Sequence, residues 1–126
     1  MERGYNMSDD CESFVELTYI DPNGTSQQLR FYYVQQLDQW GVVADYYDRE
    51  IGCWVPYAAI TKILPESVFL GRTEAFVDTN NVHHLVAWLV QEGFIRLTGD
   101  FATSGFCTYP VAQFSDSFLH EICTEQ

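Results

Sequence analysis

The sequence predicts an α+β domain: an antiparallel sheet of about five strands, one main helix packed on it and a short C-terminal helix. Strand-like segments follow one another with short links, which favours antiparallel pairing. One later segment repeats apolar residues at helical spacing. The 126 residues fit one domain, and 47% hydrophobic with 16% aromatic residues supply a core and exclude a globally disordered chain.

The first two predicted strands form a hairpin. Side chains in residues 13–20 alternate in direction, so that Phe14, Glu16 and Thr18 share one face. The sequence Asp-Pro-Asn-Gly at 21–24 is strong turn chemistry, since proline pre-sets the turn and Asn-Gly tolerates positive φ. The second strand runs over residues 28–37.

Residues 40–47 predict a third strand, and the polar turn 48–52 ends it. Residues 53–63 predict a fourth strand, in which Pro56 indicates an edge or a bulge. Residues 65–73 are predicted as a connecting loop, and residues 75–77 as a short apolar insert.

The main helix begins at a group of capping residues, Asp78 to Asn81. Beyond them, apolar residues recur at i, i+3, i+4, i+7 and i+8, which is one helical stripe. The stripe consists of Val82, Leu85, Val86, Leu89 and Val90. Gly93 is expected to end the helix as the residue after its C-cap.

After the helix, residues 94–97 are predicted to pair briefly, with turns at 98–100 and 104–105. Residues 106–114 form the final strand, and Ser115 caps a short helix that reaches Cys123. At the other end, residues 1–12 are expected to be a flexible acidic tail, with Met7 as an alternative start. Residues 13–126 are then a single domain.

Charge is the strongest global feature. Six Lys and Arg face eighteen Asp and Glu, which gives a net charge of −12 and a pI near 4.3. Such a surface repels phosphate backbones and anionic membranes, so neither nucleic acid nor membrane is an expected partner. It attracts a basic protein surface and speeds encounter with it, although solubility alone also explains the charge.

The cysteines and the ends of the chain favour a cytoplasmic protein. Cys11, Cys53, Cys107 and Cys123 are widely spaced and form no close pair of the kind that holds zinc, so reduced thiols are expected. The N-terminal residues lack the charged-then-apolar order of a signal peptide, and no apolar run approaches the roughly 20 residues of a membrane helix.

No pattern for catalysis, a metal or a cofactor stands out. Adjacent helical residues point about 100° apart, so His83 and His84 favour helix surface over chelation. Cys107 with a histidine is the one imaginable nucleophile–base pair, but a strand cysteine is usually core. The sequence lacks a phosphate-binding glycine loop, a nucleophile elbow and a paired-histidine zinc helix. We therefore expect no enzyme, metal or cofactor.

Two groups of residues are candidate partner-binding sites. One places acids among aromatic residues at the predicted turn 48–52, where aromatic anchors supply binding energy and charges steer. It comprises Asp45, Tyr46, Tyr47, Asp48, Glu50 and Trp54. The other is a small amphipathic patch of His84 and Trp88, which are i, i+4 neighbours off the apolar stripe. The alternative for both is a solvated surface.

Two sequence blocks resemble a family of small uncharacterised proteins, catalogued as a domain of unknown function. The blocks are Ala-Phe-Val-Asp-Thr-Asn-Asn at 75–81 and Ser-Gly-Phe-Cys-Thr-Tyr-Pro at 104–110, and the resemblance covers about residues 40–114. Members are carried by conjugative elements, plasmids and phages of gut bacteria. The family has no assigned activity, so the resemblance implies no site residues.

That context suggests an inhibitor of host defence. Small acidic proteins of mobile elements often block a CRISPR effector or imitate DNA toward a restriction enzyme. We therefore expect a non-enzymatic inhibitor whose partly DNA-mimicking acidic surface binds a host protein's basic nucleic-acid-binding surface. The protein is expected to be a monomer or dimer. The alternative is an accessory or structural self-associating module of element maintenance that uses Tyr32, Tyr33, Tyr46 and Tyr47. An enzyme is third, and needs a pocket holding Cys107 beside a histidine.

Overall fold

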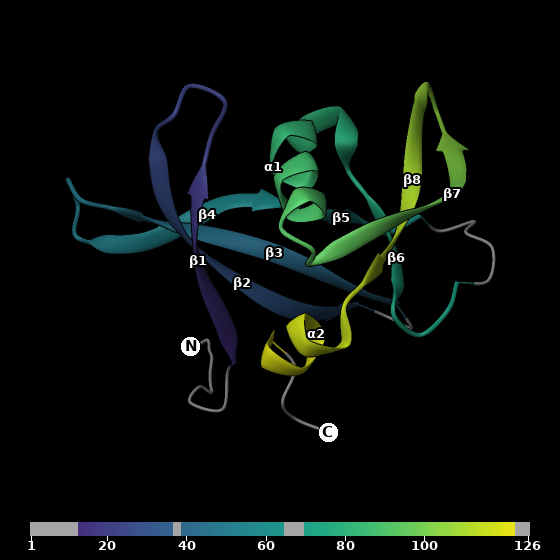
Figure 1. Ribbon diagram of the computed structural model, residues 1–126, viewed down its shortest axis with the longest axis horizontal. Coiled ribbons are helices and arrows are strands. Elements are labelled where there is room, and N and C mark those ends of the chain that lie inside the picture. The colour runs from purple at the N-terminus through teal and green to yellow at the C-terminus, as the bar shows by residue number, and fades with distance from the viewer. Residues whose placement is uncertain (1–12, 37–38, 65–69, 123–126) are drawn as a thin grey trace.

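A computed structural model describes residues 13–36, 39–64 and 70–122, which form eight strands and two helices (Figure 1). The first sheet is a meander of β1 (Phe14–Ile20), β2 (Ser26–Gln36), β3 (Gln39–Asp48) and β4 (Cys53–Ala59). The second has the order β5 (Thr61–Lys62), β6 (Glu74–Val77), β8 (Cys107–Phe114), β7 (Ile95–Ser104). The helices are α1 (Thr79–Gln91) and α2 (Asp116–Ile122). The predicted acidic tail lies outside the described residues.

The predicted first hairpin is confirmed. β1 pairs with β2 in antiparallel register, from Phe14 opposite Tyr32 to Ile20 opposite Ser26. Asp21 fixes the turn, because its Oδ1 accepts hydrogen bonds from the backbone N–H groups of Asn23 and Thr25, each at 2.9 Å. Gly24 follows with φ of 86°, a conformation that glycine adopts without steric cost.

The prediction of one sheet of about five strands is wrong, since there are two sheets of four. The predicted fourth strand, 53–63, is divided between them by the buried Ile60. Ile60 forms a backbone hydrogen bond on each side of this break. Its N–H donates to the carbonyl of Val42, and its carbonyl accepts from the N–H of Asp78. Thr61 then leads into the second sheet. The continuous apolar stretch gave no signal of this change of sheet.

Two further segments in the second half differ from the prediction. Residues predicted as a short apolar insert are part of β6, a strand that is buried over Ala75, Phe76 and Val77. The segment predicted to pair only briefly after the helix is the start of the ten-residue β7. The predicted turn at 98–100 is an irregularity within β7, where the register with β8 shifts between Leu97 and Phe101. A β-bulge carries turn residues without ending the strand.

Both predicted helices are present. The N–H of Gly93 donates to Val90 and that of Phe94 to Leu89, the pattern of a Schellman C-cap, and Gly93 has φ of 86°. Of the predicted stripe, Leu85, Val86 and Leu89 are buried, whereas Val90 is exposed. Ser115 caps α2 as predicted, since its hydroxyl accepts a hydrogen bond from the Phe118 N–H at 3.2 Å.

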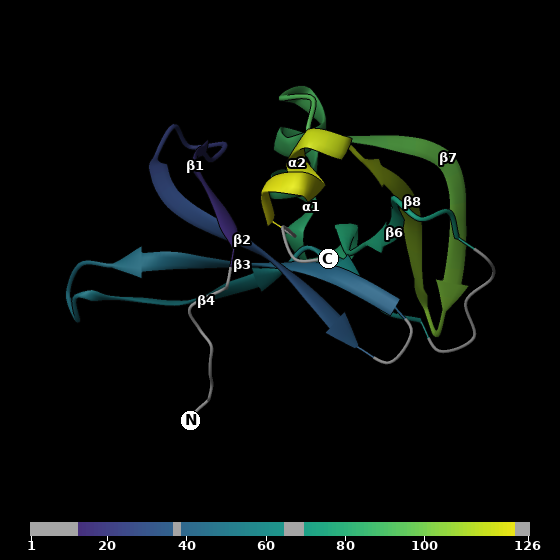
Figure 2. The ribbon, with the colours of Figure 1, turned by 90° about the horizontal axis from the view of Figure 1, so that it is seen from below.

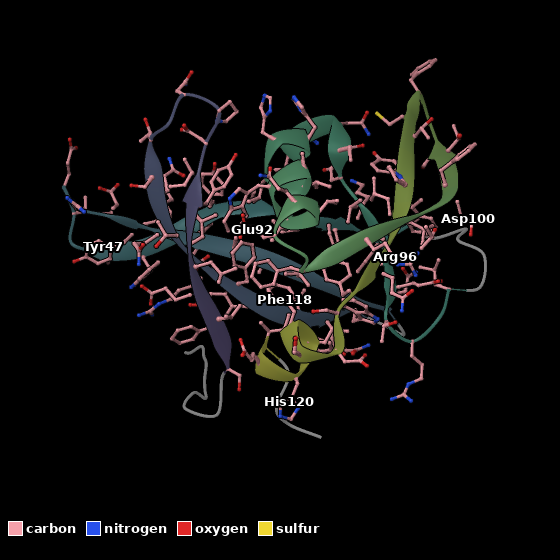
Figure 3. All side chains as sticks on the ribbon, viewed as in Figure 1. Tyr47, Glu92, Arg96, Asp100, Phe118 and His120 are labelled. Carbon is pink, nitrogen blue, oxygen red and sulfur yellow. The ribbon has the colours of Figure 1, made fainter. Side chains whose placement is uncertain are left out.

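One core joins both sheets and both helices. It includes Phe31 from β2, Leu89 from α1, Phe114 from β8 and Phe118 from α2. Phe118 reaches from α2 into this interior (Figure 3). Both helices lie on one side of β3 and β4, so the opposite side of these strands faces away from them (Figure 2). No helix of the described residues is long and apolar enough to cross a membrane.

Candidate protein-binding face

The first sheet has one face in the core and one toward solvent, and its paired tyrosines lie one on each. Tyr33 and Tyr46 pack against the core, Tyr33 stacking on Trp40 with ring centroids 5.9 Å apart. Tyr47 is 42% exposed, and Tyr32 contacts Phe14 on the outer face. The prediction that doubled tyrosines place one ring on each face is confirmed, because side chains alternate along a strand.

Register brings five of the outward side chains together in what we call the aromatic face. It consists of Phe14, Arg30, Tyr32, Tyr47 and Trp54. The Phe14 and Tyr32 rings lie 5.7 Å apart, and those of Tyr47 and Trp54 5.4 Å apart. Between these pairs the Arg30 guanidinium carbon lies 4.3 Å from the centroid of Phe14 and 4.0 Å from that of Trp54. Both contacts are cation–π interactions.

Glu16 neutralises Arg30 within this face. The Arg30 Nε donates to Glu16 Oε1 at 3.4 Å, and the Gln28 amide donates to Glu16 Oε2 at 2.8 Å. The Thr18 hydroxyl extends the network by donating to Gln28. The guanidinium is therefore held by one carboxylate and two rings, which fixes its plane against the sheet.

The predicted acids adjoin this face, Asp48 and Glu50 at the β3–β4 turn and Asp45 on β3. Asp45 is on β3 opposite Arg30 of β2 and Pro56 of β4. The Asp48 carboxylate is used to build the turn, since its Oδ1 accepts from the N–H groups of Glu50 at 2.9 Å and Ile51 at 3.4 Å. Glu50 is exposed. Asp48 thus stabilises the turn, a structural role that the sequence pattern did not indicate.

The structure does not bring all eight predicted residues together. Asp45, Tyr47 and Trp54 share the outer face, whereas Tyr46 faces the core and packs its ring against Tyr57, 5.8 Å away. Burying that ring is favourable because it adds apolar contact area.

The structure leaves only part of the predicted patch of His84 and Trp88 at the surface. Trp88 is half-buried and packs against Tyr19, at 5.4 Å, and Phe94, at 6.3 Å. His84 is exposed next to His83, and their ring centroids lie 4.0 Å apart. Val82 has non-helical dihedral angles, so the ideal angle between neighbouring helical side chains does not hold here. Among the described residues, no three metal-ligating side chains gather at one place.

The two sequence blocks meet at the start of α1. The Asn80 side-chain amide donates to the carbonyl of Thr108 at 3.2 Å, which joins the first block to the second. Asp78 is buried, and its Oδ2 accepts from the Asn81 amide at 2.9 Å. These contacts link the helix to β8 and give both blocks a structural role.

Cys107 lies in the same region but hydrogen-bonds a tyrosine. Burial raises the pKa of Tyr109, and the hydrogen bond to Cys107, the charge of Cys107 and that of Asp78 raise it further. A hollow of about 490 Å³ lies elsewhere, between the end of α1, β7 and β8. It is lined by Val90, Phe94, Arg96, Gln113 and Asp116 among others, and its Arg96 already donates to Gln113 at 2.6 Å.

Sequence reasoning missed Phe14 and Arg30 as members of the aromatic face. A signal was present, because Phe14, Glu16 and Thr18 were expected on one side of their strand. The missing information was which residues of β2 lie opposite them. That register depends on the turn and on which face is buried.

The comparisons place the chain in a family without an assigned role. A family model for a domain of unknown function, DUF4313, matches residues 34–126, so the chain belongs to that family. The match begins within β2 and includes β3, β4, the second sheet and both helices. No curated protein and no solved structure matches the chain.

Proposed function

We propose that this DUF4313 protein is a non-enzymatic inhibitor that binds a host nucleic-acid-handling defence protein through its aromatic face and the acids beside it. The observation that carries the proposal is the exposure of that face. Phe14 is 39% and Tyr47 42% exposed. Both helices lie on the other side of β3 and β4 from this outer face (Figure 2).

The composition of the face suits a protein partner. Aromatic and arginine side chains supply most of the energy at protein interfaces, and Arg30 is already ordered between Phe14 and Trp54. A side chain held in its bound geometry loses less entropy on association. The rings therefore anchor the complex, with Arg30 as their rigid spacer.

The charge indicates a partner with a basic surface. The described residues carry eleven acidic and five basic side chains, and Asp45, Asp48 and Glu50 border the aromatic face. These acids attract a surface that is rich in Lys and Arg, such as a channel for a guide or target strand, and raise the rate of encounter. Direct binding of nucleic acid is disfavoured by the same charge.

The context of a mobile element supports the choice of host protein. The blocks at 75–81 and 104–110 resemble proteins carried by conjugative elements and phages. For such an element, an inhibitor of a CRISPR effector or a restriction enzyme has an evident use. In this proposal, Asp45, Asp48 and Glu50 occupy the sites at which the partner otherwise binds nucleic-acid phosphates.

The experiment is a cleavage and co-elution assay over a panel of CRISPR effectors and restriction enzymes. We expect one enzyme to lose activity and to co-elute with the protein. The Trp54→Ala and Tyr47→Ala double variant should weaken that inhibition by at least about tenfold, as expected for two interface anchors. Leu97→Ala is the matched control, because Leu97 is 44% exposed on the other sheet. Unimpaired cleavage across the panel, or equal losses in both variants, contradicts the proposal.

A further inference from the structure

β7 is an edge strand, and its second half lacks the features that normally prevent another strand from pairing with it. It pairs with β8 on one side and ends the order β5-β6-β8-β7, so its other side presents unpaired backbone groups within the described part of the chain. Its first half is interrupted by the irregularity between Leu97 and Phe101. The second half, Phe101 to Ser104, pairs regularly and contains neither proline nor a charged residue.

The other three edges of the two sheets carry the features that normally prevent strand addition. β1 bears Glu16, and β4 contains Pro56 beside an irregular register. β5 is two residues long and includes Lys62. Charges, prolines, bulges and short length all disfavour pairing with another chain. The contrast marks the β7 edge as the one of these four that is open to a further strand.

The hairpin that carries this edge is also apolar at its surface. Phe101 is 67% exposed and Phe106, at the β7–β8 turn, is fully exposed at 108%. Gly105 makes this tight turn possible with φ of 64°. The hairpin projects away from the rest of the fold (Figure 1). Two bare phenyl groups beside an open edge are a feature of association surfaces.

Symmetry favours a second copy of this chain as the occupant, and charge limits where that copy can approach. Two copies of net charge −12 repel each other, so they approach best where each is uncharged. Residues 101–115 carry no charged side chain, the longest such stretch in the second sheet. An antiparallel strand is self-complementary about a two-fold axis, so one contact covers both open edges and closes the dimer.

We propose that residues 101–103 of β7 pair antiparallel with the same residues of a second copy, and so join the two second sheets into one. With the two-fold axis through Ala102, each Phe101 lies opposite Thr103 of the second copy on one face of the joined sheet. Phe101 then packs across the contact, where an aromatic ring beside a β-branched residue is favourable. This inference does not depend on the proposed inhibitor function.

Salt should change the affinity of the proposed dimer and that of the proposed partner complex in opposite directions. Screening weakens the repulsion between two acidic copies, so self-association should strengthen as ionic strength rises. Binding of a basic partner to the acidic border should weaken under the same change. Failure of one proposal therefore leaves the other open to its own test.

The test is sedimentation velocity on the full chain over a range of protein concentrations at low and high salt. We expect a monomer–dimer equilibrium that shifts toward dimer with both. Phe101→Lys should lower the association constant by about tenfold or more, because it places a charge in the strand contact. Tyr47→Lys adds the same charge on the aromatic face and should leave dimerisation unchanged.

Phe106→Ser is a second variant, since it alters only a fully exposed side chain. It should weaken the dimer without lowering the thermal unfolding temperature. A concentration-independent monomer at high salt overturns the proposal. So does a dimer that Tyr47→Lys disrupts while Phe101→Lys and Phe106→Ser leave it intact.

Discussion

Arg30 has two kinds of interaction at once. Its guanidinium stacks on Phe14 and Trp54 and pairs with Glu16, so three residues from β1 and β4 converge on one residue of β2. In the sequence these residues are distant, and β-strand register alone brings them together. The predicted Tyr47 and Trp54 are part of this cluster, but its central arginine could not be identified from sequence. Nothing in the sequence distinguishes Arg30 from an ordinary solvated charge.

Tyrosine ionisation gives a prediction at the residue scale. Burial raises the pKa values of Tyr19, Tyr57 and Tyr109, and the Asp21 charge raises those of the first two further. Each phenol therefore keeps its proton in the folded chain at a pH where the unfolded chain loses it, near pH 10 and above. The stability they contribute is complete below pH 10 and falls as the pH rises above it.

The measurement is a pair of titrations. Absorbance at 295 nm should show some of the eight tyrosines ionising later than in the urea-unfolded chain, and urea unfolding should show stability falling above pH 10. Tyr109→Phe should reduce both effects, because burial and Cys107 act on that phenol. Identical ionisation of the folded and unfolded chains would contradict the assignment.

At the scale of elements, local signals predicted the hairpin turn, the helix ends and the Ser115 cap, because turn and cap residues act on neighbouring backbone groups. The division into two sheets could not be predicted from the sequence, because it depends on contacts between residues that are far apart in the chain. The pattern of residues 53–63 predicts one strand. In the structure, however, Ile60 hydrogen-bonds Val42, which precedes it in the sequence, and Asp78, which follows it. Apolar periodicity reports burial and does not name the partner strand.

Thr61 gives a test of this junction between the sheets. Its buried hydroxyl accepts a hydrogen bond from the Val42 N–H at 3.0 Å, and it lies against Gly41, where a Cβ would collide with it. Thr61→Val keeps the shape and leaves the Val42 N–H without this acceptor. The loss should be about 1–3 kcal/mol in the free energy of unfolding, measured in urea. Thr108→Val, on an exposed strand position outside the proposed dimer contact, should change it by less than about 0.5 kcal/mol.

At the scale of the whole molecule, the acidic border of the aromatic face and the uncharged stretch 101–115 lie at opposite ends. The acids that border the aromatic face lie at the β3–β4 end, whereas the β7–β8 hairpin, which contains the uncharged residues 101–115, lies at the opposite end (Figure 1). Tyr47 and Asp100 mark the two sides in Figure 3. Under the two proposals, one molecule binds a basic partner at one end and a second copy at the other. Composition gave the net charge but not this separation, which requires the fold.

The last prediction tests whether the location of the charge, rather than its amount, governs partner binding. Asp48 is unsuitable for reversal, because its carboxylate holds the turn through Glu50 and Ile51. Asp45→Lys with Glu50→Lys changes the net charge by four at the border of the aromatic face. Association with the inhibited enzyme should slow by about tenfold or more at low salt, and the difference should shrink as the Debye length falls from about 10 Å at 0.1 M to about 3 Å at 1 M.

Glu92→Lys with Glu121→Lys is the matched control, since it makes the same change at exposed positions on α2 and at the end of α1. If net charge alone steers the encounter, both double variants slow association equally, and the acidic border has no special role. If only the first slows it, and stopped-flow rates of the wild type fall with salt, the border directs the partner to the aromatic face. An association rate indifferent to salt in all three proteins would mean that the rings act without steering, because screening acts on every exposed charge.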